Sequence, residues 1–190
     1  MQPMPSIMTR RVRDAPPLSW ACAVGLAVCV CLPPSAGAAP HDHGTAQVQI
    51  ALQGEQLTLL LQLPQDSLVG FEYAPRTSAQ RQAMADALGR LRNAADLIQP
   101  ESAAQCRLTR AEVKDPHAIR ADGAGGGADH ADVEAEIGFR CARAEQLRTL
   151  GIGLLETFPR LKRVQAVVAT PQGQRKFTLR RPARELKLPR

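Results

Sequence analysis

The stretch Asp129–Cys141, DHADVEAEIGFRC, alternates between apolar and polar residues over its whole length. Strand side chains switch faces at every residue, so this pattern is typical of a half-buried strand in an antiparallel sheet. The apolar face consists of Ala131, Val133, Ala135, Ile137, Phe139 and Cys141. The polar face begins with His130 and carries three carboxylates. This strand therefore offers a buried cysteine for a cross-link and an exposed face where a cation could bind.

The same alternation predicts hairpins on either side of this strand. Residues 45–52 and 57–63 flank a turn at 53–55, and Pro64 ends this first hairpin. Residues 106–113 alternate with a phase slip, which a bulge near Thr109–Arg110 would reconcile. That strand and the strand over 133–141 then form a second hairpin.

Two further regions near the C-terminus predict strands. Residues 164–168 and 177–179 flank the turn sequence Pro171-Gln172-Gly173 and predict a third hairpin. Alternation at 150–154 and 186–188 predicts short additional strands.

One long amphipathic helix is predicted over about residues 77–98. Thr77 and Gln80 form a capping box, and apolar residues then recur at helical spacing until the chain approaches Pro100. Together these elements predict an α+β fold. It is a single domain, residues 39–190, with a mostly antiparallel sheet built from β-hairpins and a flexible glycine-rich loop at 115–129.

The N-terminus is typical of a secretory signal peptide. Arginines at 10, 11 and 13 precede an uncharged run over 18–32 and small residues at 35–38. The apolar run is shorter than the roughly 20 residues that a membrane-spanning helix needs. We therefore expect residues 1–38 to be removed and the mature protein to be periplasmic, with no integral membrane segment. Twin-arginine export and lipid attachment at Cys29 remain alternatives.

Removal of the signal peptide would leave two of the five cysteines, Cys106 and Cys141. Two cysteines in an exported domain are expected to form a disulfide, and the second hairpin would bring these two to the same end. A reactive or metal-bound thiol pair is the alternative.

The charge and aromatic content argue against nucleic-acid binding. Removing residues 1–38 takes away three arginines and one aspartate, which lowers the net charge from +6 to +4. The remaining aromatic residues, Phe71, Tyr73, Phe139, Phe158 and Phe177, are too few for a base-stacking platform. The basic residues near 160–163 and 175–190 are expected to form a solvated surface attracted to anionic envelope components.

The histidines are the candidate metal ligands. None of the four lies inside an apolar run; they are His41, His43, His117 and His130. Neutral imidazoles bind Zn²⁺, and nearby carboxylates could assist them, the candidates being Asp42, Asp129 and Asp132. Four ordinary exposed histidines are the alternative. Because imidazole ligands must be neutral, zinc binding is expected to fade below about pH 6.5, where free histidine gains its proton.

Motifs of catalysis are missing from the sequence. It contains no G-x-S-x-G nucleophile motif and no phosphate-binding glycine loop with its lysine. The row Asp132, Glu134 and Glu136 could serve a hydrolase, but such a row is usually a solvated strand face. We expect the protein not to be an enzyme.

A series of motifs occurs in a characteristic order along the chain. They are His41-x-His43-Gly44, Val69-Gly70-Phe71-Glu72, Cys106, the strand from His130 to Cys141, Phe158-Pro159 and Thr170-Pro171-Gln172-Gly173-Gln174. With this order the chain resembles the ZrgA-like family of periplasmic proteins over essentially its whole mature length. The resemblance implies zinc acquisition, with zinc attributed to a histidine-rich segment between the two cysteines. In this chain that segment holds only His117 and His130, and Tyr73 stands where many relatives have a histidine.

The resulting functional hypothesis is a periplasmic accessory protein of zinc homeostasis or acquisition. It would bind Zn²⁺ through the four histidines and act near a metal transporter or another envelope protein. The alternative is an envelope interaction module that keeps the fold without binding metal.

Overall fold

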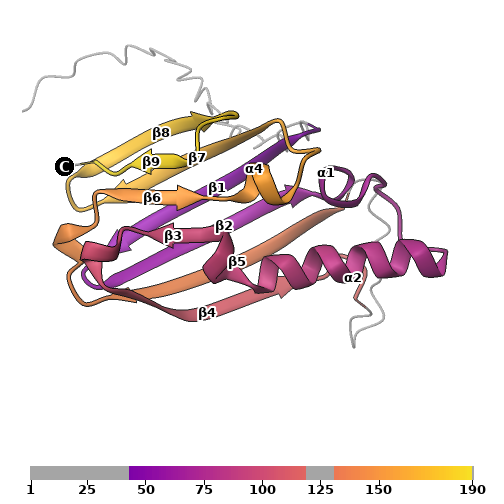
Figure 1. Ribbon diagram of the computed structural model, residues 1–190, viewed down its shortest axis with the longest axis horizontal. Helices are drawn as coiled ribbons and strands as arrows, with labels where there is room; N and C mark the ends of the chain where they lie inside the picture. The colour runs from indigo at the N-terminus through magenta and orange to yellow at the C-terminus, as the bar shows by residue number, and fades with distance from the viewer. Residues whose placement is uncertain (1–42, 119–130, 190) are drawn as a thin grey trace, which may run out of the picture. The chain divides into compact units, whose positions relative to one another are not determined.

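The computed structural model describes residues 43–118 and 131–189, and the structural statements below concern those residues. The predicted signal peptide and residues 119–129 of the predicted loop lie outside them. A larger and a smaller sheet make up the fold, together with one long helix (Figure 1). Among the described residues, no helix has the length and apolar character needed to cross a membrane.

The larger sheet has six strands in the order β4-β5-β2-β1-β7-β8. In chain order these strands are β1 (Thr45–Gln53), β2 (Gln56–Pro64), β4 (Cys106–Lys114), β5 (Asp132–Cys141), β7 (Arg163–Thr170) and β8 (Gly173–Leu179). The smaller sheet, in the order β3-β6-β9, consists of β3 (Ile98–Pro100), β6 (Thr149–Ile152) and β9 (Glu185–Lys187). The α-helices are α1 (Gln65–Val69), α2 (Ser78–Arg92), α3 (Ala94–Leu97) and α4 (Leu154–Thr157), and short 3-10 turns span Ser102–Ala104 and Ala144–Gln146.

Strand β5 lies inside the larger sheet, between β4 and β2. The six apolar residues predicted to face the core are all buried. The register between β4 and β5 shifts between Leu108 and Arg110, which confirms the predicted bulge. The three predicted hairpins are also present, as the pairs β1–β2, β4–β5 and β7–β8.

The pairing of β1 with β7 is parallel, whereas the other strand pairs of both sheets are antiparallel. It aligns Thr45 with Arg163 and Ala51 with Ala169. Hairpin signals are local and could not predict a pairing between strands so far apart in sequence. The mostly antiparallel α+β prediction is otherwise confirmed.

The long helix begins as predicted but ends earlier. Thr77 and Gln80 form the capping box, with Gln80 N donating to Thr77 Oγ1 at 3.2 Å and Thr77 N donating to Gln80 Oε1 at 3.1 Å. The helix ends at Arg92 because Asn93 leaves helical geometry, and the chain continues through α3 into β3. Pairing of Ile98–Pro100 with β6 explains why the predicted extension to residue 98 was wrong.

The long helix and the smaller sheet contribute to a core shared with one face of the larger sheet. Met84, Leu88 and Leu91 of α2 belong to the same buried cluster as Leu150 of β6 and Leu186 of β9. Figure 1 shows these elements in front of the larger sheet. One face of the larger sheet packs against this core and the other face meets solvent. This difference explains why apolar and polar residues alternate along its strands.

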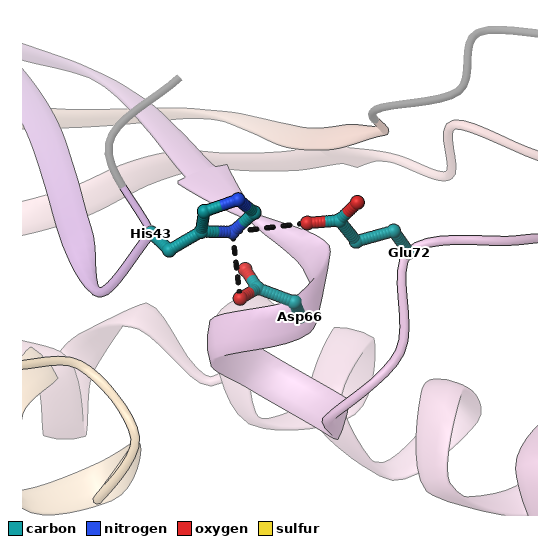
Figure 2. Close-up of side chains that lie close together, drawn as sticks. All are labelled: His43, Asp66 and Glu72. Atoms are coloured by element: carbon teal, nitrogen blue, oxygen red, sulfur yellow. Dashed lines mark hydrogen bonds and ion pairs between the residues drawn. The ribbon is translucent and has the colours of Figure 1, made fainter.

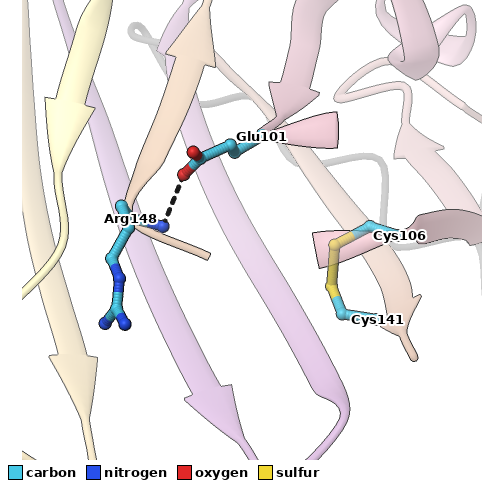
Figure 3. Close-up of a disulfide and its surroundings, with 4 residues drawn as sticks. All are labelled: Glu101, Cys106, Cys141 and Arg148. Atoms are coloured by element: carbon cyan, nitrogen blue, oxygen red, sulfur yellow. Dashed lines mark hydrogen bonds between the residues drawn. A yellow bond between two sulfur atoms is a disulfide. The ribbon is translucent and has the colours of Figure 1, made fainter. Parts of the chain in front are cut away.

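The disulfide between Cys106 and Cys141 is present, as predicted (Figure 3). It joins the first residue of β4 to the last residue of β5, at the end of the hairpin opposite its connecting loop. Near it, the Glu101 carboxylate accepts hydrogen bonds from the backbone N–H groups of Arg148 and Thr149, at 2.8 and 3.2 Å. This end of the fold is therefore fixed both covalently and by hydrogen bonds.

Candidate metal centre

Three potential metal ligands meet beside the start of β1 (Figure 2). His43 Nδ1 lies 3.0 Å from Asp66 Oδ2 and 2.9 Å from Glu72 Oε1. The ligand atoms of the three residues all lie within 4.8 Å of one another. Carboxylate oxygens accept hydrogen bonds, so the Nδ1 that faces both of them carries the hydrogen in this arrangement.

A short helix places the two carboxylates. Pro64 ends β2 and precedes α1, and Gly70 ends α1 in the left-handed conformation with φ of 88°. The Gly70 N–H donates to Asp66 O at 2.7 Å. Asp66 lies in the first turn of α1 and Glu72 follows two residues after the cap, so a single helical turn separates the two carboxylates in the chain.

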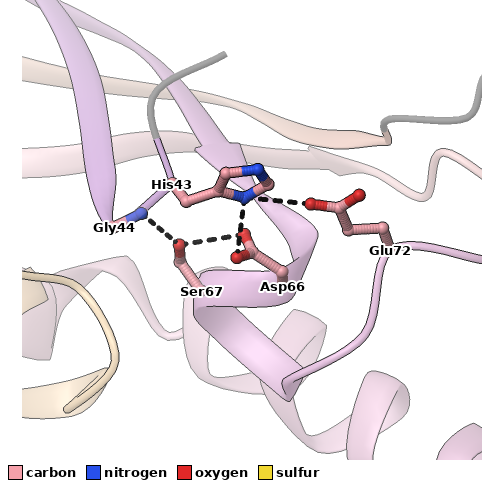
Figure 4. Close-up of polar contacts among 5 residues, drawn as sticks. All are labelled: His43, Gly44, Asp66, Ser67 and Glu72. Atoms are coloured by element: carbon pink, nitrogen blue, oxygen red, sulfur yellow. Dashed lines mark hydrogen bonds and ion pairs between the residues drawn. The ribbon is translucent and has the colours of Figure 1, made fainter.

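Hydrogen bonds of Gly44 fix the backbone next to His43 (Figure 4). Gly44 N donates to Ser67 Oγ at 2.9 Å, and Ser67 Oγ donates to Asp66 Oδ1 at 3.0 Å. The carbonyl of Gly44 accepts from the N–H groups of Lys162 and Arg163, at 2.8 and 3.1 Å. The backbone beside His43 is thus fixed to both α1 and β7, and Ser67 also orients the Asp66 carboxylate.

Alanine at Gly70 is expected to lower the free energy of unfolding by about 1–2 kcal/mol, because a Cβ disfavours the left-handed conformation. The added Cβ would also lie 3.0 Å from Arg160 Cζ, but that guanidinium is the far end of a flexible side chain and can move. Urea denaturation measures the change.

The matched control is Gly89→Ala in the last turn of α2, where an added Cβ meets no atom within 4 Å. Alanine there should raise the free energy of unfolding by about 0.5–1 kcal/mol, since glycine is a poor helix residue. Equal effects at the two positions would contradict the role given to the Gly70 conformation.

The site is open to solvent. The side chain of His43 is 59% exposed, and those of Asp66 and Glu72 are 26% and 28% exposed. Ala131 and Asp132, at the start of β5, line the same shallow depression. An ion held here would exchange readily with solution or with another protein.

The donor set and spacing fit zinc. Imidazole nitrogen and carboxylate oxygens are zinc ligands with bonds of about 2.1 Å, so two ligand atoms of a tetrahedral ion lie about 3.4 Å apart. The observed 2.9 and 3.0 Å separations are hydrogen-bond distances, and an outward shift of a few tenths of an ångström would admit the ion. The hydrogen that His43 Nδ1 shares with the two carboxylates would have to leave before this nitrogen could bind the ion.

The predicted histidines have different positions. His43 belongs to the cluster, whereas His117 Nε2 lies 2.6 Å from Gln65 Oε1, at the first residue of α1. His41 and His130 lie outside the described residues, as do Asp42 and Asp129. Of the predicted carboxylate helpers, Asp132 lines the depression.

The acidic row on β5 is largely engaged with β4. Lys114 Nζ lies 2.9 Å from Glu134, and Arg110 Nε lies 3.4 Å from Glu136. The hydrogen bond and charge of Glu112, together with the charge of Glu136, raise the pKa of the Arg110 guanidinium. These contacts of Glu134 and Glu136 agree with a solvated strand face.

Sequence reasoning did not identify Asp66 and Glu72 as ligands. Glu72 lies within the Val69-Gly70-Phe71-Glu72 motif, and this motif is the sequence signal that could have identified it. Asp66 lies two residues after the proline that ends β2, and no spacing in the sequence connects it with His43.

A known protein family matches most of the chain. The profile of a family described as "ZrgA family zinc uptake protein" matches residues 40–188, which is more than half of the chain. None of the curated proteins matches it. The match includes all three residues of the cluster and both cysteines of the disulfide.

Proposed function

The chain belongs to the ZrgA family of zinc uptake proteins, and from this premise and the site geometry we propose that it is a periplasmic zinc-binding accessory protein. The ion binds to His43, Asp66 and Glu72. The protein acts by binding rather than by catalysis, and it passes zinc to a metal transporter or another envelope protein. Export through the signal peptide at residues 1–38 places it in the periplasm.

The observation that carries the proposal is the convergence of an imidazole nitrogen and two carboxylates within ligand distance of one another. The exposure of this cluster to solvent favours a site that binds and releases an ion, because a structural zinc site is closed by four protein ligands. Three described donors leave a coordination position for water, for a donor of a partner, or for His41 or His130. The last two remain predicted ligands, and single alanine substitutions test them.

Calorimetric titration of Zn²⁺ into the tag-free chain Ala39–Arg190, which forms one compact unit, tests this function. The double variant Asp66→Asn/Glu72→Gln removes both negative charges and is expected to lower zinc affinity at least about 10-fold, since metal sites lose 10–100-fold when even their outer partners are removed. The matched control is Asp86→Asn/Glu185→Gln, with the same chemical changes on exposed positions of α2 and β9. It should bind zinc like the wild type.

Equal zinc affinity of the two double variants would exclude the cluster as the binding site. No measurable binding by the wild type would favour the interaction module without metal function. A transporter partner is tested separately, by comparing capture of envelope proteins with and without zinc.

A further inference from the structure

Gln65 is a fully buried polar residue next to the metal centre. Its side-chain amide makes two hydrogen bonds, from Nε2 to Tyr73 O at 3.0 Å and between Oε1 and His117 Nε2 at 2.6 Å. Its backbone N–H donates to Ala131 O at 3.0 Å. One residue thus connects four segments that surround the site.

The direction of the bond to His117 follows from these contacts. The carbonyl of Tyr73 can only accept, so the Gln65 atom facing it must be the NH₂ group. The other side of the amide, Oε1, therefore faces His117 and can only accept as well. His117 must donate, and its hydrogen is on Nε2.

The anchors of Gln65 are next to both site carboxylates in the chain. Asp66 follows Gln65 directly, and Glu72 directly precedes Tyr73, whose carbonyl Gln65 holds. The Gln65 amide therefore contributes to the positions of the two carboxylates, by joining the residue before Asp66 to the residue after Glu72. Without a donor at residue 117, Oε1 would be buried and unpaired, and the amide would have to turn away from Tyr73 to reach another partner.

We infer that His117 is a positioning residue of the metal centre, which acts by donating its Nε2–H to Gln65 and not by coordinating zinc. The inference rests on the proposed function. It gives His117 a role that differs from the ligand role predicted from sequence, because its Nε2 is hydrogen-bonded to Gln65 and it is not part of the cluster of His43, Asp66 and Glu72.

Two substitutions at residue 117 separate the roles. Glutamine keeps a terminal N–H donor but is a poor zinc ligand, whereas phenylalanine keeps a planar ring and has no donor. His117→Gln is expected to bind zinc within about 2-fold of the wild type, and His117→Phe about 10-fold or more weakly, as for other outer partners of metal ligands. Gln65→Leu should resemble His117→Phe, and Gln62→Leu on the exposed face of β2 serves as its control.

The outcomes are distinguishable in zinc calorimetry. If His117→Gln binds as weakly as His117→Phe, the imidazole itself is needed and the inference is overturned. Wild-type zinc affinity in His117→Phe also overturns the inference, but it leaves the proposed zinc-binding function unaffected. Absence of zinc binding by the wild type overturns both the inference about His117 and the proposed function.

Nuclear magnetic resonance of the ring nitrogens gives a second readout that needs no variant. His117 is expected to show the Nε2–H form before and after addition of zinc, while the ring signals of His43 shift. A zinc-dependent shift of a His117 ring nitrogen comparable with that of His43 would identify it as a ligand and end the inference. This measurement decides the question if His117→Phe does not fold.

Discussion

Alanine at His43 is expected to lower zinc affinity at least about 100-fold, more than the 10–100-fold that removal of outer partners usually costs. The reason is that His43 supplies the nitrogen of the cluster and is the residue that both carboxylates face. Calorimetric titration of Zn²⁺ measures the loss, and circular dichroism reports whether the fold is kept.

Lys162→Ala is the local control for that variant. The Lys162 side chain packs against Gly44, and a Cβ on Gly44 would lie 3.2 Å from its Cγ and Cδ, so this substitution disturbs the same neighbourhood without removing a donor. It also removes a positive charge, so zinc affinity should stay equal or rise. A loss like that of His43→Ala would mean that local packing, not coordination, explains the effect.

Replacing both Cys106 and Cys141 by alanine is expected to lower the free energy of unfolding by about 3–4 kcal/mol. The bond joins residues 35 apart, and without it the unfolded chain regains the freedom that the closed loop had removed. Chemical denaturation measures the loss, and reduction of the wild type should shift its midpoint in the same direction.

The disulfide variant should bind zinc normally under conditions where it is folded. Asp132 lines the metal centre and Cys141 ends the same strand, and ten residues of strand separate the two ends by about 30 Å. Weakened zinc binding by the folded variant would show that the two ends of β5 are coupled. An unchanged denaturation midpoint on reduction would show instead that the cross-link contributes little to stability.

The fold could be predicted to the extent that its signals are local. The alternation in β5, the capping box at Thr77 and the bulge near Thr109 each depend on residues close together in sequence, and all three are present. The parallel pairing of β1 with β7 has no local signal, because each strand alternates in the same way whatever its neighbour. The predicted extension of the helix to residue 98 fails because Ile98–Pro100 pairs with β6, and this pairing is also long-range.

Only part of the site could be predicted, because only some of its signals are local in the sequence. A histidine outside an apolar run is visible in sequence, and His43 does belong to the cluster. Its partners come from a helix and a segment 23 and 29 residues away, and they reach it through the β1–β2 hairpin and the hydrogen bond between Gly44 and Ser67. The role of His117 depends on a buried amide, and burial of a single glutamine cannot be predicted from its own position.

The connection of Gly44 to Lys162 and Arg163 has a consequence for the timing of assembly. His43 lies two residues before the first strand, but the neighbouring backbone that fixes it bonds to a strand that is synthesised more than a hundred residues later. Contacts of such long sequence separation form late, after the loop between them has closed. A nascent or truncated chain that ends before β7 would therefore display every donor of the cluster and still hold zinc poorly, so that loading of the ion reports completion of the domain.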